Sequence, residues 1–171
     1  MDRGIAAMHG HVIICGYGRV GRSAAEYLVA TGHQVVVVDN GSRDETPDLL
    51  ASLDWVDVVT HETNKGFAAG CNAGAGKASN PIVVFLNNDT VVEPGWLAAL
   101  RRTVDQPPGF ALATSRVVYM HDPALIDSAG DGVLQWGAAF KRFHGTRAAE
   151  AARSGEVFGV CGAACLVTKT A

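Results

Sequence analysis

The sequence lacks a strong net charge, a long apolar run and a paired cysteine motif. Its formal net charge is −3 at pH 7 and its lysine and arginine residues are dispersed, so there is no general reason to expect nucleic acid as a partner. No apolar run approaches the roughly 20 residues that span a bilayer, and residues 1–10 lack the apolar core of a secretory signal. We therefore expect no transmembrane segment, and a protein that is cytoplasmic or lies at the inner face of a membrane.

The four cysteines do not form the two pairs that a structural zinc site usually supplies. Cys15 lies in an apolar segment and Cys71 in an expected helix. Cys161 and Cys165 are four positions apart in the apolar segment VCGAACLV. Because free cysteines are usually buried, we expect buried free thiols here in preference to a metal centre.

The length of 171 residues and the hydrophobic content of 48% suit one folded domain with its own core. Apolar runs predict buried strands at residues 12–15, 34–39, 57–62 and 81–89. Amphipathic or small-residue segments predict helices at residues 22–32, 45–53, 66–78 and 96–105. This βαβαβαβα order predicts a Rossmann-like, three-layer α/β fold with a mostly parallel sheet and helices on both faces.

The rest of the chain has a different character. Residues 111–120 and 157–170 are strand-like, whereas residues 121–155 are polar, glycine-rich and weakly periodic. Long loops in compact domains are usually functional, so we expect residues 121–155 to form a loop that closes over a bound substrate. Residues 1–10 are expected to be a leader, and residues 11–171 a single nucleotide-binding domain.

A glycine-rich signature lies between the first expected strand and helix. Gly16, Gly18 and Gly21 form G-x-G-x-x-G, in which the first permits a sharp turn, the second admits a pyrophosphate and the third allows close helix–strand contact. Asp39 ends the next strand, where a ribose-binding acid belongs in this fold. With HVIICGYGRVG, residues 11–39 resemble the dinucleotide-binding regulatory domains of potassium uptake and channel systems. That resemblance implies NAD or an adenine nucleotide; the alternative is a scaffold that binds none.

Four segments from residue 34 onward form a second signature. They are VVVVDNGSRDET, NKGFAAGCNAG, FLNNDTVVEPGWL and VCGAACLVTK. Their order resembles family 2 glycosyltransferases of the rhamnosyltransferase-like branch, which have a GT-A fold. The resemblance implies a UDP- or dTDP-sugar donor, a divalent cation, a glycan or lipid-linked acceptor and, in an active enzyme, hexosyl or rhamnosyl transfer.

The resemblance also implies which residues bind the nucleotide. Asp39 would accept hydrogen bonds from the base, since an ionised carboxylate is an acceptor only. Asn40, in the turn beside it, and Asn88 would also contact the nucleotide-sugar. Asn64, Gly66 and Asn72 would match the nucleotide-side loop of the family. For Asn72, a helix-surface amide is the alternative.

Asn88 and Asp89 occupy the place of the family's metal motif, which often has two aspartates. Here the motif is Asn87-Asn88-Asp89, with one carboxylate. One carboxylate, phosphate oxygens and water together suit Mg²⁺ or Mn²⁺, and such a metal would neutralise charge on the departing diphosphate. The alternative is an ordinary turn after a strand.

The chain departs from the family at two places. The family's first strand ends in Thr-Tyr-Asn or a similar sequence, whereas residues 15–18 are Cys-Gly-Tyr-Gly. The family continues after GAACLVTK with an acidic loop that supplies the general base, so we expect a chain truncated at its C-terminus and assign no catalytic residue. The isolated His61, His121 and His144 are expected to be surface or hydrogen-bonded histidines.

Overall fold

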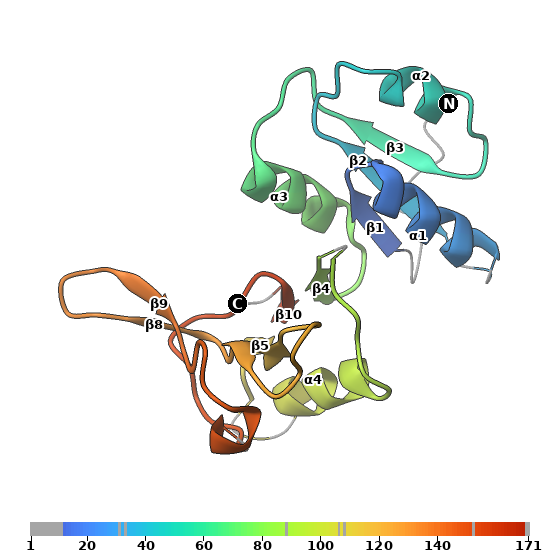
Figure 1. Cartoon of the computed structure of the whole chain (residues 1–171). Coiled ribbons are helices and arrows are strands. Elements are labelled where there is room, and N and C mark those ends of the chain that lie inside the picture. Colours follow the sequence, from blue (N-terminus) through green and yellow to red (C-terminus); the bar gives the residue numbers. More distant parts are fainter. Residues whose placement is uncertain are drawn as a thin grey trace. The chain divides into compact units, whose positions relative to one another are not determined.

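The computed structural model describes residues 12–30, 32, 34–87, 89–105, 107, 109–151 and 153–169. The chain forms two compact units, which we name the N-terminal unit, Met1–Pro81, and the C-terminal unit, Ile82–Ala171 (Figure 1). The expected leader lies outside the described residues, and the single domain expected over residues 11–171 stays a prediction. No helix among the described residues has the length and apolar character to cross a membrane.

The N-terminal unit contains a parallel sheet with the strand order β1-β2-β3. Its strands are β1 (Val12–Cys15), β2 (Val35–Asp39) and β3 (Asp57–Thr60). All five residues of β2 are buried, as the sequence predicted, because β2 is central and pairs with both neighbours. The prediction that β1 is buried is wrong: β1 is an edge strand of this sheet, its first three residues are half-buried and Cys15 is exposed.

Helices cover both faces of this sheet. They are α1 (Arg19–Ala30), α2 (Thr46–Ala51) and α3 (Phe67–Lys77). On one face Val35 and Val37 pack with Ala25 of α1 and Leu50 of α2. On the other face α3 lies so close that a Cβ on Gly74 would be 3.7 Å from Val38. Burying one valine contributes about 1.5–2 kcal/mol, so the valines of β2 stabilise the packing of helices on both faces of the sheet. The expected layered α/β architecture is therefore confirmed in this unit.

The start of α1 differs from the sequence-based prediction. The helix begins at Arg19, inside the glycine signature, whereas we predicted a start after Gly21. The reason is that Gly21 has no side chain, so the first helical turn can pack directly on the backbone of Gly16. The helix therefore begins three positions after Gly16.

The C-terminal unit contains an antiparallel sheet with the order β4-β10-β5. Its strands are β4 (Ile82–Leu86), β5 (Leu112–Thr114) and β10 (Ala164–Thr168), and α4 (Trp96–Asp105) packs on them through Leu100, next to Ala113 and Leu166. The mostly parallel sheet predicted for the whole chain is thus wrong for β4, which pairs with a strand from the far end of the sequence. The physical reason is burial: Leu166 of β10, which lies between β4 and β5, is fully buried in this arrangement.

The prediction that residues 121–155 form a loop is wrong, because this segment contains several short strands and a helix. After β6 (Val117–Val118) the chain forms β7 (Ile126–Ser128), β8 (Asp131–Val133), β9 (Ala139–Lys141) and the short helix η2 (Ala148–Ala151). Figure 1 shows β8 and β9 as an antiparallel hairpin. Strands of two or three residues are too short to display an alternating pattern, yet Ile126 and Ser128 are completely buried.

Candidate functional site

The buried carboxylate of Asp39 is the most unusual polar group of the N-terminal unit. Asp39 ends β2 and is only 2% exposed. Its Oδ1 accepts a hydrogen bond from the backbone N–H of Ser42 at 3.0 Å, whereas Oδ2 is buried without a hydrogen-bond partner. Leaving a buried acceptor unpaired costs about 1–3 kcal/mol, and more when it is charged. Because such groups are rare in native proteins, this oxygen is a candidate acceptor for a ligand donor.

The side chain of Asn40 fixes the loop that follows β3. Its Nδ2 donates to Asn64 Oδ1 at 3.1 Å and to the Gly66 carbonyl at 2.9 Å. Its Oδ1 accepts from the Lys65 N–H at 3.2 Å and lies 2.9 Å from His61 Nδ1. An amide has two donor hydrogens and two acceptor lone pairs, so the protein fills all four positions and leaves none for a ligand. Since Oδ1 can only accept, the proton of His61 resides on Nδ1.

The loops after β2 and β3 meet backbone to backbone. Gly41 has φ +78°, and a Cβ there would overlap the Thr63 carbonyl carbon and lie 2.6 Å from the Asn64 nitrogen. Asn64 Oδ1 also accepts from the Gly66 N–H at 2.8 Å, just before α3 begins. The structure therefore brings Asp39, Asn40, Asn64 and Gly66 to one edge of the sheet, while Asn72 is exposed further along α3.

Replacing Asn40 by Ala is expected to lower the free energy of unfolding by about 1–3 kcal/mol, because it leaves several donors and acceptors of the loop unpaired. Urea denaturation followed by circular dichroism measures this change. Asn72→Ala is the matched control: an exposed helix position should change stability by less than about 0.5 kcal/mol. Equal effects of the two substitutions would show that Asn40 does not hold the loop.

The glycine signature has the backbone geometry expected of it. Gly16 has φ +93°, and its N–H donates to the Val38 carbonyl at 2.8 Å. Gly21 has no room for a Cβ beside the Gly16 carbonyl oxygen, whereas a Cβ on Gly18 would meet open space. The sharp turn and the close helix contact are thus confirmed, and binding of a pyrophosphate beside Gly18 stays a prediction. Tyr17 is 6% exposed and belongs to the core.

The expected metal motif lies in the C-terminal unit, in the turn after β4. The Asn87 N–H donates to the Ala163 carbonyl at 2.8 Å, and Thr90 Oγ1 donates to the Asn87 carbonyl at 2.6 Å. Asp89 is exposed in this turn, and Asn88 lies outside the described residues. Within the described part of the chain, no group of three or more His, Cys, Asp or Glu side chains is placed to hold a metal. One carboxylate with ligand and water oxygens fits a hard cation such as Mg²⁺ or Mn²⁺.

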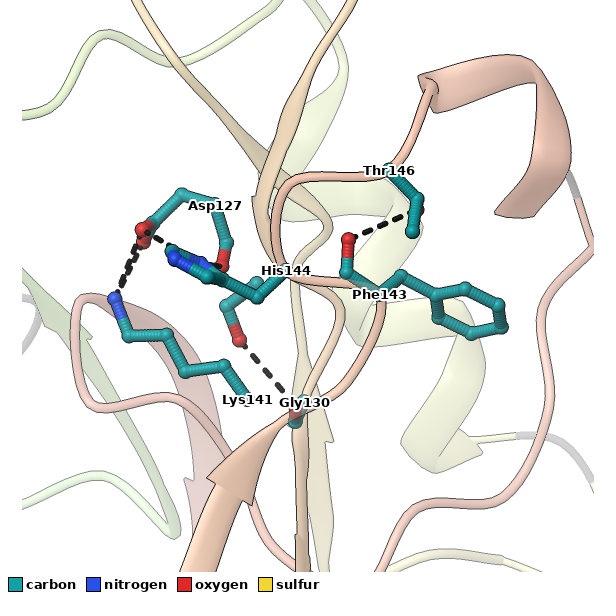
Figure 2. A network of polar contacts seen from close by, with 7 residues as sticks. Asp127, Gly130, Lys141, Phe143, His144 and Thr146 are labelled. Carbon is teal, nitrogen blue, oxygen red and sulfur yellow. Dashed lines mark hydrogen bonds and ion pairs between the residues drawn. The ribbon is translucent and has the colours of Figure 1, made fainter.

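Two acids of residues 121–155, Asp127 and Asp122, are hydrogen-bonded to protein groups. Both carboxylate oxygens of Asp127 lie 2.9 Å from Lys141 Nζ, and His144 Nδ1 lies 2.8 Å from the Asp127 carbonyl (Figure 2). Hydrogen bonding to Asp127 raises the pKa of Lys141. Asp122 Oδ1 accepts from the Ala124 N–H at 3.2 Å. These contacts stabilise turns around β7 and β9. We assign no catalytic role to Asp122 or Asp127.

The three isolated histidines have partners within their own units. His61 bonds to Asn40 and His144 to the Asp127 carbonyl, while the His121 ring lies 5.2 Å from the Tyr119 ring. The expectation of surface or hydrogen-bonded histidines is therefore confirmed. None of the four cysteines, all of which the structure describes, is in a disulfide. Cys161 and Cys165 are buried, as predicted, whereas Cys71 is half-buried and the prediction is wrong for Cys15, which is exposed at the end of an edge strand.

Comparison with known proteins gives a family for most of the chain. Residues 22–169 match the family Glycosyl transferase family 2, so the match begins just after the glycine signature. The pre-mycofactocin glycosyltransferase of Mycobacterium tuberculosis is 34% identical over 89 residues, which are 51% of this chain and 19% of that protein.

Two further relatives have similar identity. An uncharacterized glycosyltransferase of Mycobacterium bovis is 31% identical over 111 residues, which are 63% of this chain and 49% of that protein. Glycosyltransferase AglE of Haloferax volcanii is 30% identical over 69 residues, which are 38% of this chain and 23% of that protein. The chain thus spans between about a fifth and a half of the length of these curated relatives.

Proposed function

The chain belongs to glycosyl transferase family 2, and from this premise we propose that it binds a nucleoside-diphosphate sugar for transfer of the glycosyl group to an acceptor. The observation that carries the proposal is the buried Asp39 carboxylate, whose Oδ2 has no hydrogen-bond partner. A nucleobase N–H or a ribose hydroxyl is a neutral donor that would pair with it. Membership of the family favours the nucleobase over the ribose as the partner of Asp39, because Asn64, Gly66 and Asn72 are then explained as contacts to the same nucleotide.

The loop after β3 supplies the setting for that contact. Asn40 holds Asn64 and Gly66 in place, so the edge of the sheet beside Asp39 is organised before any ligand binds. Preorganised polar groups bind with a smaller entropy loss than mobile ones. We assign Asp39 to the nucleoside and Asn64, Gly66 and Asn72 to the neighbouring nucleotide contacts, with Asn40 as their support.

For the C-terminal unit we propose that Asp89 binds a divalent cation, Mg²⁺ or Mn²⁺, and that Asn88 contacts the nucleotide-sugar. The exposed carboxylate of Asp89 is the hard oxygen ligand in this turn. When bound, the cation would neutralise charge on the leaving diphosphate as a Lewis acid.

The reaction proposed for the whole protein is an in-line displacement at the anomeric carbon, with inversion. A UDP- or dTDP-sugar is the proposed donor, a hexosyl or rhamnosyl residue the transferred group, and a glycan or lipid-linked hydroxyl the acceptor. The general base that takes the acceptor proton must lie within hydrogen-bond reach of it. None of the described residues is assigned that role.

A thermal-shift titration tests donor and metal binding together, because a ligand that prefers the folded state raises the unfolding midpoint. We expect UDP- or dTDP-sugars to raise the midpoint with Mn²⁺ and to do so much less in EDTA. Asp89→Ala should remove the metal-dependent part, whereas Glu93→Gln, an exposed acid four positions away, should leave it intact. A midpoint shift of equal size with and without metal would refute the role of Asp89.

The glycine signature supports a second candidate, a regulatory site for NAD or an adenine nucleotide. Its supporting observation is the open space beside Gly18 next to a sharp turn at Gly16. The same titration includes NAD and ATP without metal. A rise in the midpoint with these ligands alone would favour the second candidate, and none at millimolar concentration would exclude it.

A further inference from the structure

Two thiols meet between the edge strand and the small-residue helix of the N-terminal unit. Cys15 is the last residue of β1, and its Sγ lies 3.5 Å from the Gly70 carbonyl of α3. The next residue of α3 is Cys71, and its thiol is one of the groups that raise the pKa of Cys15. Both thiols are free.

The backbone of α3 packs directly on the end of β1. A Cβ on Gly74 would be only 2.8 Å from Ile13 Cγ2 and 3.7 Å from Cys15 Sγ. Gly70 is buried in the same helix, one turn before Gly74. Because Gly74 has no side chain, α3 lies directly against Ile13 and Cys15, and a disulfide requires the two sulfurs to approach to roughly 2.05 Å.

We propose that Cys15 and Cys71 form a reversible disulfide that ties β1 to α3. A small disulfide such as glutathione disulfide is the oxidant. One cysteine thiolate attacks a sulfur of the oxidant, forms a mixed disulfide and releases one glutathione thiolate. The second cysteine thiolate then attacks the protein sulfur and releases the other. The two cysteines lose two electrons and two protons, and the oxidant gains them as two glutathione thiols.

The surroundings of the thiols set the rate of this exchange. Cys15 is exposed as a residue, but its sulfur faces α3, and this partial burial, followed by the neighbouring Cys71, raises the pKa of Cys15 to about 11. Burial also raises the pKa of Cys71. The thiolate is the nucleophile, so exchange should be slow at neutral pH. As long as the pH is below the pKa of the attacking thiol, the exchange rate should increase about tenfold with each unit by which the pH is raised.

The pair does not depend on the proposed donor site, because neither thiol is assigned to it. A bond between these positions would close a loop of more than 50 residues, as the separation of 55 between Cys15 and Gly70 shows. Cross-links that close long loops restrict the unfolded chain strongly. The oxidised chain should therefore unfold several degrees higher than the reduced chain.

Peptide mapping of the whole chain tests the proposal. The chain is incubated with glutathione disulfide at pH 7 and pH 9, blocked with iodoacetamide and digested with trypsin without reduction. Cleavage after Arg and Lys places Cys15 in residues 4–19, Cys71 in residues 66–77, and both remaining cysteines in residues 154–169. We expect residues 4–19 and 66–77 to be linked, faster at pH 9, and to separate with dithiothreitol.

Two variants and two outcomes make the test decisive. C15S and C71S each remove the linked peptide and should leave glutathione on the remaining thiol of the pair. Glutathione on both wild-type thiols without a link, or a bond confined to residues 154–169, would overturn the proposal. The wild-type digest alone identifies the linked pair, so the result does not depend on the folding of either variant.

Discussion

Asp39→Asn should weaken binding of the nucleotide-sugar donor about 10- to 100-fold, the equivalent of one charge-assisted hydrogen bond of about 1.5–3 kcal/mol. The asparagine keeps the shape of the side chain and can keep the bond from Ser42 through its oxygen. In place of the unpaired Oδ2 it presents an NH₂ group, which cannot accept a hydrogen bond from a base or a ribose. Isothermal titration calorimetry with a UDP- or dTDP-sugar and Mn²⁺ measures the loss.

The same substitution should leave the free energy of unfolding within about 1 kcal/mol of wild type, since it exchanges one buried unpaired polar group, Oδ2, for another, the NH₂ group. This separates a ligand contact from a purely structural carboxylate. Asp54→Asn, an exposed change in the same unit, is the control and should alter neither quantity. Unchanged donor affinity, or a loss of stability of several kcal/mol, would show that Asp39 serves the fold and not the ligand.

Gly41→Ala is expected to cause the largest loss of stability, about 3–5 kcal/mol, or roughly 10 °C in the unfolding midpoint. Gly41 has φ +78°, which L residues rarely adopt, and its Cβ would be forced against the Thr63 carbonyl carbon and the Asn64 nitrogen. Both obstacles are backbone atoms, so no side-chain rotation relieves the overlap. Differential scanning fluorimetry and urea denaturation give the midpoint and the free energy.

A second glycine provides the matched control for this prediction. Gly76 lies in α3, where an added Cβ meets nothing within 4 Å. Gly76→Ala should therefore be neutral or stabilise the protein by up to about 1 kcal/mol, through the better helix propensity of alanine. If Gly41→Ala were as well tolerated as Gly76→Ala, the close approach of the two loops would not exist in solution.

Local sequence patterns were sufficient to predict one buried strand of the N-terminal unit and one helix of the C-terminal unit. The valine run before Asp39 predicted a buried strand of a parallel sheet, and β2, which is buried at every residue and pairs in parallel with β1 and β3, confirms it. The start of helix α4 at Trp96 and its end at Asp105 were also predicted correctly, because Pro94-Gly95 and Pro107 delimit the amphipathic segment. Strong periodicity and clear helix breakers carry that information within about ten residues.

The features that were missed depend on contacts between distant residues. The pairing of β4 with β10 joins Val84 to Leu166, and no local pattern shows which strand will lie beside another. In the same way, Asn40 looked like a turn residue, although its main partners, Asn64 and Gly66, are more than 20 positions away. The unpaired Asp39 oxygen was also invisible in the sequence, because pairing is a property of the folded surroundings.

The amide of Asn40, whose donor and acceptor positions are all occupied, also makes the protein sensitive to deamidation. Asparagine side chains are thermolabile, and hydrolysis to aspartate would replace the Nδ2 donor group by an oxygen. That oxygen would face two other acceptors, Asn64 Oδ1 and the Gly66 carbonyl, at distances that now suit attraction. A change of one mass unit at one position would thus turn two attractive contacts into two repulsive ones. Deamidation of Asn40 during storage would therefore destabilise the loop after β3.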